Sequence, residues 1–266
     1  MATSLCVELC STAARVRPAV TVVVPAFNEA TRLAATLPVL AAHALRHDME
    51  IVVVDDGSTD HTAQLAAAIL GPPRAGHVVR LEHNMGKGAA VRAGVAVARG
   101  DAVVFMDADL ATDLGDLPAL LAGLDDHDIV IGSRRVAGAV VSDGAGRRQI
   151  GAAFNVVVRS LTGLSIADTQ CGCKAFRADA ARRVFALART DGFAFDVELL
   201  LIATRLGLSI DERPVRWHAV PGSKVSRLRD PVRMTADVWR VRRRWSARGE
   251  KTIDLPALTT PNVTFS

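Results

Sequence analysis

Two aspartates, Asp107 and Asp109, stand one residue apart directly after the apolar run 102–106. A short run of β-branched and aromatic residues predicts a buried strand, so both acids are expected where that strand ends. Extended spacing alone would send the two side chains to opposite faces, but a turn can bring both carboxylates toward one hard cation, Mg²⁺ or Mn²⁺. The alternative is a pair of solvated turn acids that caps the next helix.

Three further apolar runs end in polar loops, at 25–29, 55–58 and 83–87. In a parallel sheet the carboxyl ends of the strands and the loops that follow them collect at one edge, where ligands bind. A carboxylate accepts a hydrogen bond from a base N–H or a ribose hydroxyl, and a divalent ion bridges two acids to a diphosphate. The pattern therefore predicts a site for a nucleotide diphosphate conjugate.

Two other nucleotide-binding motifs do not fit the sequence. A Walker phosphate loop would need glycine five residues before Gly86 and serine or threonine after Lys87, but Leu81 and Gly88 stand there. A dinucleotide-binding fingerprint would need glycines right after the first strand, and the segment 25–29 contains none.

The elements that must position these loops alternate between strand and helix. Apolar runs predict strands at 19–24, 50–54, 78–81, 102–106 and 129–131, and stretches rich in alanine or leucine predict helices near 31–45, 62–70, 89–98 and 117–124. Alternation of this kind predicts an α/β fold, with a mainly parallel sheet, flanking helices and right-handed crossovers.

Length and composition set further bounds. The chain has 266 residues, half of them apolar, which is enough for one large globular domain. The sequence contains no run of 18 apolar residues, so it predicts no membrane span. The segment 1–18 lacks the basic start and long apolar stretch of a signal peptide. We therefore expect a cytosolic protein. The four cysteines form two close pairs without neighbouring histidines, which favours reduced thiols over a zinc site.

Eight motifs together resemble one known family. VPAFNE at 24–29, VDDGSTD at 54–60, NMGKG at 84–88 and DAD at 107–109 are similar to motifs of the family-2 glycosyltransferases of GT-A fold. GSR at 132–134, DTQCGCK at 168–174, FAFDVELL at 193–200 and GSK at 222–224 resemble the polyprenyl-phosphate sugar synthases, in particular the dolichyl-phosphate β-glucosyltransferase branch. The similarity covers residues 19–245, and it implies a Rossmann-type GT-A domain.

The resemblance also implies roles for individual residues. It places the donor nucleotide against Pro25, Ala26, Glu29, Asp55, Asp56, Lys87 and Asp107, and the metal, Mg²⁺ or Mn²⁺, on Asp107 and Asp109. It places the acceptor phosphate against Arg134, Arg148 and Lys224, with Lys174 as a further candidate, and it makes Asp109, Arg134 and Lys174 the catalytic group. Two positions depart from the family: Cys173 replaces an aromatic residue, and Ala111 lacks the polar side chain that some mannose-type synthases use as a third metal ligand.

The implied reaction moves a hexose, glucose or mannose, from UDP-glucose or GDP-mannose to a polyprenyl phosphate. A phosphate monoester is already an anion near neutral pH, so arginines that place it for in-line attack matter more than a general base. In-line attack on an α-linked donor gives inversion and a β-linked product.

Two alternatives remain open at this point. A soluble family-2 glycosyltransferase with a small-molecule or other hydroxyl acceptor would need a carboxylate base, for which Asp196 and Glu198 are candidates. These two acids also fit the first turn of a helix. The other alternative is a sugar-nucleotide-binding module without turnover, and the intact pair of Asp107 and Asp109 argues against it.

Nine basic residues fall between Lys224 and Arg248, against only two acids. Apolar residues at helical spacing among them predict an amphipathic basic helix at 231–248, after a glycosyltransferase domain at 19–230 and an extension at 1–18, and before a loose tail at 249–266. Such a helix either lies on a membrane surface, which would make the protein peripheral on the inner face of the membrane, or docks on the domain. Nucleic acid is not an expected partner, because the known binding motifs are missing.

Overall fold

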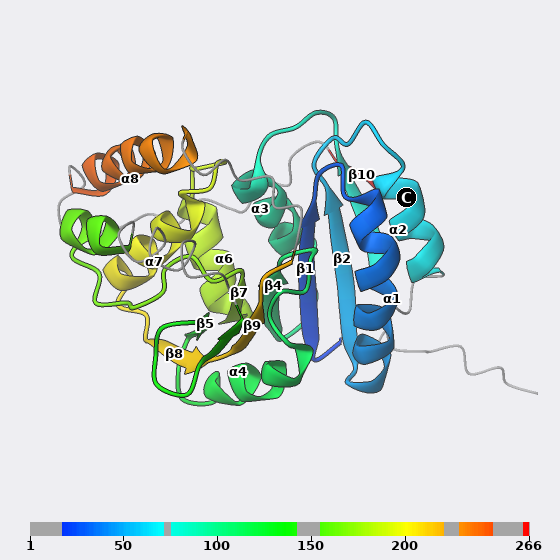
Figure 1. The fold of residues 1–266 in the computed structure, drawn as a ribbon, viewed down its shortest axis with the longest axis horizontal. Helices are drawn as coiled ribbons and strands as arrows, with labels where there is room; N and C mark the ends of the chain where they lie inside the picture. Colours follow the sequence, from blue (N-terminus) through cyan, green and yellow to red (C-terminus); the bar gives the residue numbers. More distant parts are fainter. Residues whose placement is uncertain (1–17, 72–75, 143–154, 221–228, 247–262, 266) are drawn as a thin grey trace, which may run out of the picture.

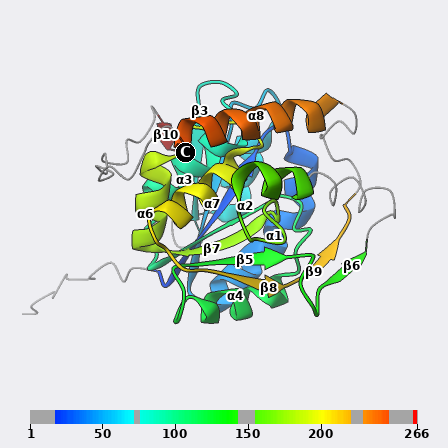
Figure 2. The ribbon, with the colours of Figure 1, turned by 90° about the vertical axis from the view of Figure 1, so that its left-hand side faces the viewer.

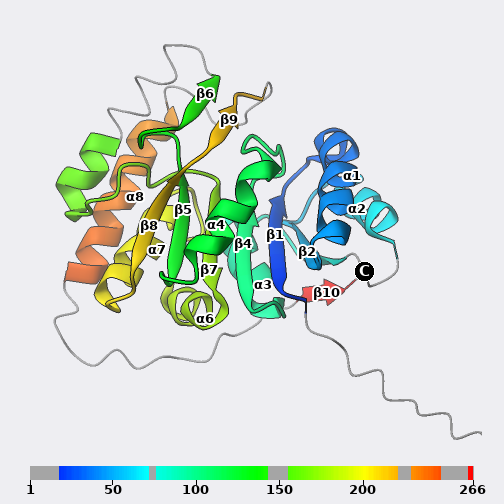
Figure 3. The same cartoon turned by 90° about the horizontal axis from the view of Figure 1, so that it is seen from below.

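The computed structural model describes residues 18–71, 76–142, 155–220, 229–246 and 263–265. Its centre is an eight-stranded sheet in the order β10-β3-β2-β1-β4-β7-β5-β8 (Figure 3). The strands are β1 (Val20–Ala26), β2 (Met49–Asp55), β3 (Gly76–Leu81), β4 (Ala102–Met106), β5 (Ile129–Ser133), β7 (Cys173–Arg177), β8 (Ile210–Pro214) and β10 (Val263–Phe265).

The sheet is mainly parallel, as the alternation of strands and helices predicts. Strand β1 pairs in parallel with β2 and β4, β2 with β3, and β5 with β8. Two strands run the other way: β7 is antiparallel to both β4 and β5, and β10 is antiparallel to β3. The four parallel strands β3-β2-β1-β4 therefore end at one edge of the sheet, where the predicted polar loops follow them.

Helices cover both faces of the sheet (Figure 1). They are α1 (Ala30–Arg46), α2 (Thr62–Leu70), α3 (Lys87–Val97), α4 (Leu117–Gly123), α6 (Ala178–Leu187), α7 (Phe195–Arg205) and α8 (Arg229–Ser246), with a 3₁₀ turn η1 (Leu114–Asp116) and a helical segment at 155–162. Successive residues of β1 point to opposite faces, so that Val22 and Val24 pack with α1, α2 and α4, while Val23 packs with α3, α6, α7 and α8. The result is a three-layer α/β domain.

A second, two-stranded sheet lies at one end of the molecule (Figure 2). Its strands, β6 (Val140–Ser142) and β9 (Arg216–His218), are parallel. Trp217 of β9 also forms an isolated antiparallel bridge with Thr112, which follows the predicted acid pair. This small sheet therefore connects the C-terminal half of the domain to the loop after β4.

All five predicted strands and all four predicted helices are present, with ends shifted by a few residues at most. Helix α8 begins at Arg229, two residues before the predicted basic helix, and packs into the same core as α7, while β10 lies within the predicted tail and pairs with β3. The division into domains stays a prediction. Among the described residues, no helix combines the length and apolar character that crossing a membrane requires.

Candidate active site

The loops after β1 and β2 are joined to one another. Ala26 and Asp55 are register partners at the ends of the two strands, and the Asp56 N–H donates to the Ala26 carbonyl at 2.8 Å. Asn28, whose φ of 51° lies in the left-handed region, accepts at its Oδ1 from the Thr59 N–H at 2.8 Å. The two predicted donor loops therefore form one surface.

The acid pair follows β4, as the sequence predicts. The Asp107 N–H donates to the Gly172 carbonyl at 3.1 Å, and Asp109 Oδ1 accepts from the Ala111 N–H at 3.0 Å. Leu110 closes the turn with φ at 49°, an uncommon value for a leucine and of the kind that concentrates at functional sites. Burial, together with the negative charge of Asp107, raises the pKa of Asp109.

Lys87 lies at the first position of α3 and points to the acid pair. Its Nζ is 2.6 Å from Asp107 Oδ1. Burial lowers the pKa of Lys87, but the negative charges of Asp107 and Asp196 outweigh this effect, so the pKa lies above its usual value. The lysine is therefore a cation at neutral pH, placed where an anionic group of a donor is expected.

The other predicted donor residues differ in what they contact. Pro25 and Ala26 end β1. Glu29 Oε2 pairs with Arg32 at 2.6 Å, and buried Asp55 accepts from the Ser58 N–H at 3.1 Å.

Asp56 is a special case among the donor residues. Its two oxygens accept from the backbone N–H groups of Met85 and Gly86, at 2.8 Å each. Burial raises its pKa despite these hydrogen bonds. Asp56 thus anchors the loop that carries Lys87, and contact with the base or ribose remains a prediction for it.

A carboxylate clamp holds Arg134 within reach of the charge of Asp107. Its Nε and Nη2 donate to the two oxygens of Asp168 at 2.7 and 2.9 Å, and its backbone N–H donates to the same carboxylate at 3.0 Å. Burial acts to lower the pKa of Arg134, but Asp168 and, more weakly, Asp107 raise it. The guanidinium also lies over the indole ring of Trp217, with Cζ 5.4 Å from the ring centroid.

Lys174 is placed differently from its predicted role. Its side chain is 0% exposed, and its Nζ lies 2.5 Å from Asp196 Oδ1 and 2.7 Å from the Cys171 carbonyl. A lysine that is enclosed and paired in this way does not reach an acceptor from the surface. The motif at 168–174 predicts that Lys174 lies near the site. It does not reveal that Asp196 of α7 pairs with this lysine in the interior.

Of the two acids of uncertain role, Glu198 has a structural one. It accepts at Oε2 from the backbone N–H groups of Arg189 and Thr190, and at Oε1 from Arg244 and the Trp245 indole N–H at 2.8 and 3.1 Å. Asp196 is paired with Lys174. Both acids lie in the first turn of α7, as the first-turn interpretation predicts, and both are buried.

The donor set at the end of β4 fits a hard divalent cation. Asp107 and Asp109 present carboxylate oxygens within one turn, and each acid carries a negative charge close to the other, which a cation would relieve. No group of three or more potential metal-ligating His, Cys, Asp or Glu residues occurs in the described part of the chain.

Two predicted acceptor residues, Arg148 and Lys224, lie outside the described residues. Three residues not predicted for the site take part in it: Asp168, Trp217 and Glu212. Asp168 stands in a motif that the resemblance singles out, whereas Trp217 and Glu212 carry no spacing signal, because their partners come from distant parts of the chain.

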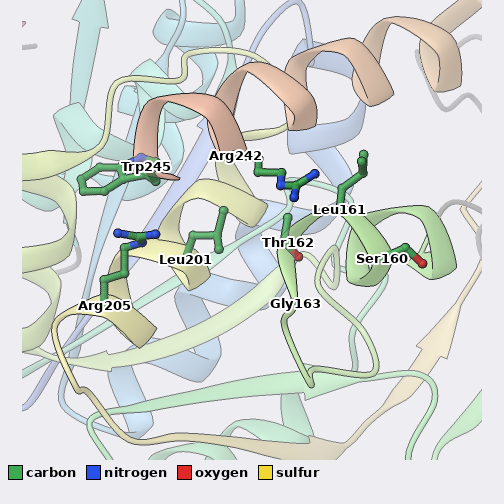
Figure 4. Close-up of a pocket in the computed structure, with 8 residues that line it drawn as sticks. All are labelled: Ser160, Leu161, Thr162, Gly163, Leu201, Arg205, Arg242 and Trp245. Carbon is green, nitrogen blue, oxygen red and sulfur yellow. The ribbon is translucent and has the colours of Figure 1, made fainter. Parts of the chain in front are cut away.

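A separate cavity of about 330 Å³ lies between α7, α8 and the segment 155–162 (Figure 4). Its lining includes Arg205, Arg242, Leu201 and Trp245. None of the predicted site residues that the structure describes lines it. The cavity is therefore distinct from the edge of the sheet that carries the acid pair.

Comparison with solved structures establishes the fold first, which is the GT-A fold. Glucosyl-3-phosphoglycerate synthase from Mycobacterium tuberculosis, in complex with Mn²⁺, UDP and glucosyl-3-phosphoglycerate, superposes with a TM-score of 0.63 over 86% of this chain and 80% of that one, at 22% identity. A second mycobacterial protein superposes with a TM-score of 0.64, at 21% identity, over 94% of this chain and 83% of that one.

The family follows from the sequence. The sequence profile of glycosyl transferase family 2 matches residues 21–185, and this chain belongs to that family. Its relatives include the dolichyl-phosphate β-glucosyltransferase of Dictyostelium discoideum, 33% identical over 84% of this chain and 74% of the relative, and that of Mus musculus, 36% identical over 84% and 75%. The resemblance in the motifs is thereby confirmed at the level of family and fold.

Proposed function

We propose that this chain transfers glucose from UDP-glucose to a polyprenyl phosphate of dolichyl type, with inversion to a β-linked product. The observation that carries the proposal is the clamp of Asp168 on Arg134, which holds a guanidinium in place within reach of the charge of Asp107. A planar guanidinium is the side chain best suited to grip a phosphate. The names of the relatives, dolichyl-phosphate β-glucosyltransferases, support the same acceptor and sugar.

Each part of the site has a task in this reaction. A divalent cation held by Asp107 and Asp109 would neutralise the charge that builds on the departing diphosphate. Lys87 adds a positive charge at the same place, and Asp55 and Glu29 line the loops proposed for the nucleotide. Arg134 binds the acceptor phosphate, whose own negative charge makes it a nucleophile without a general base.

Two competing substrates are less well supported. The named relatives act with glucose, and a related fold was solved with UDP-glucose and Mn²⁺, which favours UDP-glucose over GDP-mannose. A hydroxyl acceptor would need an accessible carboxylate base, but Asp196 and Glu198 are buried and bound to internal partners. We therefore retain the phosphate acceptor.

We also propose that the protein works at a membrane surface, where the apolar chain of a polyprenyl phosphate resides. Helix α8 supports this with exposed Arg240, Arg242 and Arg243 next to Trp239, whose exposed fraction is 50%. Arginine and tryptophan on one helix face suit the headgroup region of an anionic bilayer.

Transfer assays test the proposal directly. Purified protein is incubated with Mn²⁺, radiolabelled UDP-glucose and a short-chain polyprenyl phosphate. In parallel reactions, radiolabelled GDP-mannose replaces the donor, or a free polyprenol replaces the acceptor. Label in the lipid product only with UDP-glucose and the phosphate is the expected result. Transfer to the alcohol at an equal rate would refute the role of Arg134, and binding of UDP-glucose without transfer to either acceptor would refute the enzyme assignment.

A further inference from the structure

We propose that Trp217 is a positioning residue for the acceptor: its indole ring fixes the guanidinium of Arg134 relative to the acid pair. Glu212 supports the same group indirectly, through Asp168. The inference rests on the proposed function, because it concerns how the site places an anionic acceptor.

The guanidinium of Arg134 is held in two ways. Asp168 takes the edge formed by Nε and Nη2, and the guanidinium Cζ lies over the indole ring of Trp217. A guanidinium carries five N–H donors in one plane, so the two-point contact with the carboxylate fixes one edge, while the ring limits movement of the group toward its own side. The donors that remain, including those of Nη1, then have a defined direction. With 27% of its side chain exposed, Arg134 keeps a route to an acceptor oxygen.

The indole ring is in turn tied to the loop that follows the acid pair. On one side of Trp217 the Arg216 N–H donates to Asp116 at 2.6 Å, and on the other side the His218 N–H donates to the Ala111 carbonyl at 2.8 Å. The ring also lines a small hollow together with Asp107. Trp217 therefore links the acceptor arginine to the segment that begins with Asp107 and Asp109.

Glu212 of β8 fixes the carboxylate that clamps Arg134. Its two oxygens accept from the backbone N–H groups of Ala167 and Asp168, at 2.7 and 3.0 Å. Asp211, its neighbour on the same strand, pairs instead with Arg213 at 2.6 Å and does not take part in this chain of contacts. The two adjacent acids thus provide a test residue and a matched control.

Placement matters because in-line attack requires the acceptor oxygen at a defined distance from the sugar carbon. A displacement of about 1 Å at the reacting centre lowers the rate by as much as about 100-fold. The donor loops after β1 and β2 are built from other residues, Asn28, Asp56 and Thr59 among them. Loss of the ring should therefore weaken use of the acceptor and leave nucleotide binding unchanged.

The experiment compares the full-length wild type with Trp217→Leu, Trp217→Phe, Glu212→Gln and the control Asp211→Asn. Calorimetry gives the affinity for UDP with Mn²⁺, and then the affinity for a short-chain polyprenyl phosphate in the presence of both. Transfer assays give kcat/KM for the same acceptor. We expect Trp217→Leu and Glu212→Gln to lower kcat/KM by about 10- to 100-fold. In both, the affinity for UDP should stay unchanged, while Trp217→Phe and Asp211→Asn should resemble the wild type.

The outcomes separate this inference from the proposed function. Acceptor affinity and kcat/KM in Trp217→Leu equal to those of the wild type would overturn the inference, as would an equal loss of UDP affinity, which marks a merely structural ring. If Trp217→Leu does not fold, the comparison of Glu212→Gln with Asp211→Asn decides. A wild type that binds UDP but no polyprenyl phosphate would refute the acceptor itself, and the inference with it.

Discussion

The central residues of the site are charges already balanced within the protein. Lys87 neutralises Asp107, and its raised pKa keeps it protonated at neutral pH. Asp109 has a raised pKa because it is partly buried next to Asp107. Lys87 balances one of the two acids, so Asp107 and Asp109 together can still bind a divalent cation. The residue-scale predictions follow from that balance.

Replacing Asp109 with Asn removes one of the two carboxylates and leaves the shape of the turn. We expect kcat to fall by about 100- to 1,000-fold, the usual loss when one stabilising group at a developing charge is removed. Thermal stabilisation by UDP should no longer increase when Mn²⁺ is added. Asp101→Asn, at an exposed position before β4, is the control. Mn²⁺-enhanced UDP binding that survives in Asp109→Asn would contradict the metal assignment.

Gly172 offers a second test, which leaves both acids in place. A Cβ at this position would lie 2.1 Å from Asp107 Oδ2, so Gly172→Ala must displace that carboxylate. Because the clash is with the end of a flexible side chain, the midpoint of thermal unfolding should change little. The affinity for UDP should lose its dependence on Mn²⁺, as titration calorimetry would reveal. Unaltered Mn²⁺ dependence would mean that Asp107 Oδ2 is not needed.

At the scale of elements, strands with a continuous apolar sequence could be predicted, whereas β7, which contains charged residues, could not. Strands β1, β2 and β4 are apolar along most of their length, and their ends locate the acid pair and the donor loops. Strand β7 contains Lys174, whose burial is possible only because Asp196 arrives from α7. The Arg134–Trp217 contact likewise joins β9 to the residue that follows β5. Tertiary partners of this kind leave no periodic signal in a sequence.

Helix α8 is attached to the domain through Glu198. Burial favours the neutral acid, but hydrogen bonds from Trp245 and from the backbone of Arg189 and Thr190 lower the pKa of Glu198 below its ordinary value of 4.5. A lowered folded-state pKa stabilises the fold above that ordinary value, and this contribution is lost as the pH falls through the folded-state pKa.

We therefore expect Glu198→Gln to lower the free energy of unfolding by about 1–3 kcal/mol at neutral pH, the cost of poorly satisfied buried partners. The difference from the wild type should shrink below pH 4.5, because the wild-type acid is then progressively protonated as well. Urea unfolding at several pH values measures it. Glu82→Gln, at an exposed position, is the control. A difference that does not vary with pH would show that the charge of Glu198 is unimportant.

At the scale of the whole molecule, the two sides of α8 differ. Val238, Val241 and Trp245 are buried against α7, so the apolar stripe predicted from the sequence is used for docking. The outward side exposes Trp239, with the guanidinium of Arg243 over its ring at 5.7 Å. The segment 155–162 lies beside α8 (Figure 2), and its Val156 and Val157 are exposed. A docked helix can therefore still present a basic and apolar surface outward.

If that surface meets an anionic membrane, the double variant Arg242→Gln/Arg243→Gln should bind it more weakly while the fold stays intact. Arg244 is kept because it pairs with Glu198. Each basic residue near such a surface contributes about 1 kcal/mol, so the partition coefficient onto phosphatidylserine vesicles should fall by about 30-fold in a sedimentation assay at low salt. Arg46→Gln/Arg182→Gln removes the same charge from α1 and α6. An equal fall of the partition coefficient in that control would show that only the net charge matters. An unchanged partition coefficient in both variants would show that α8 is a docked helix without a membrane role.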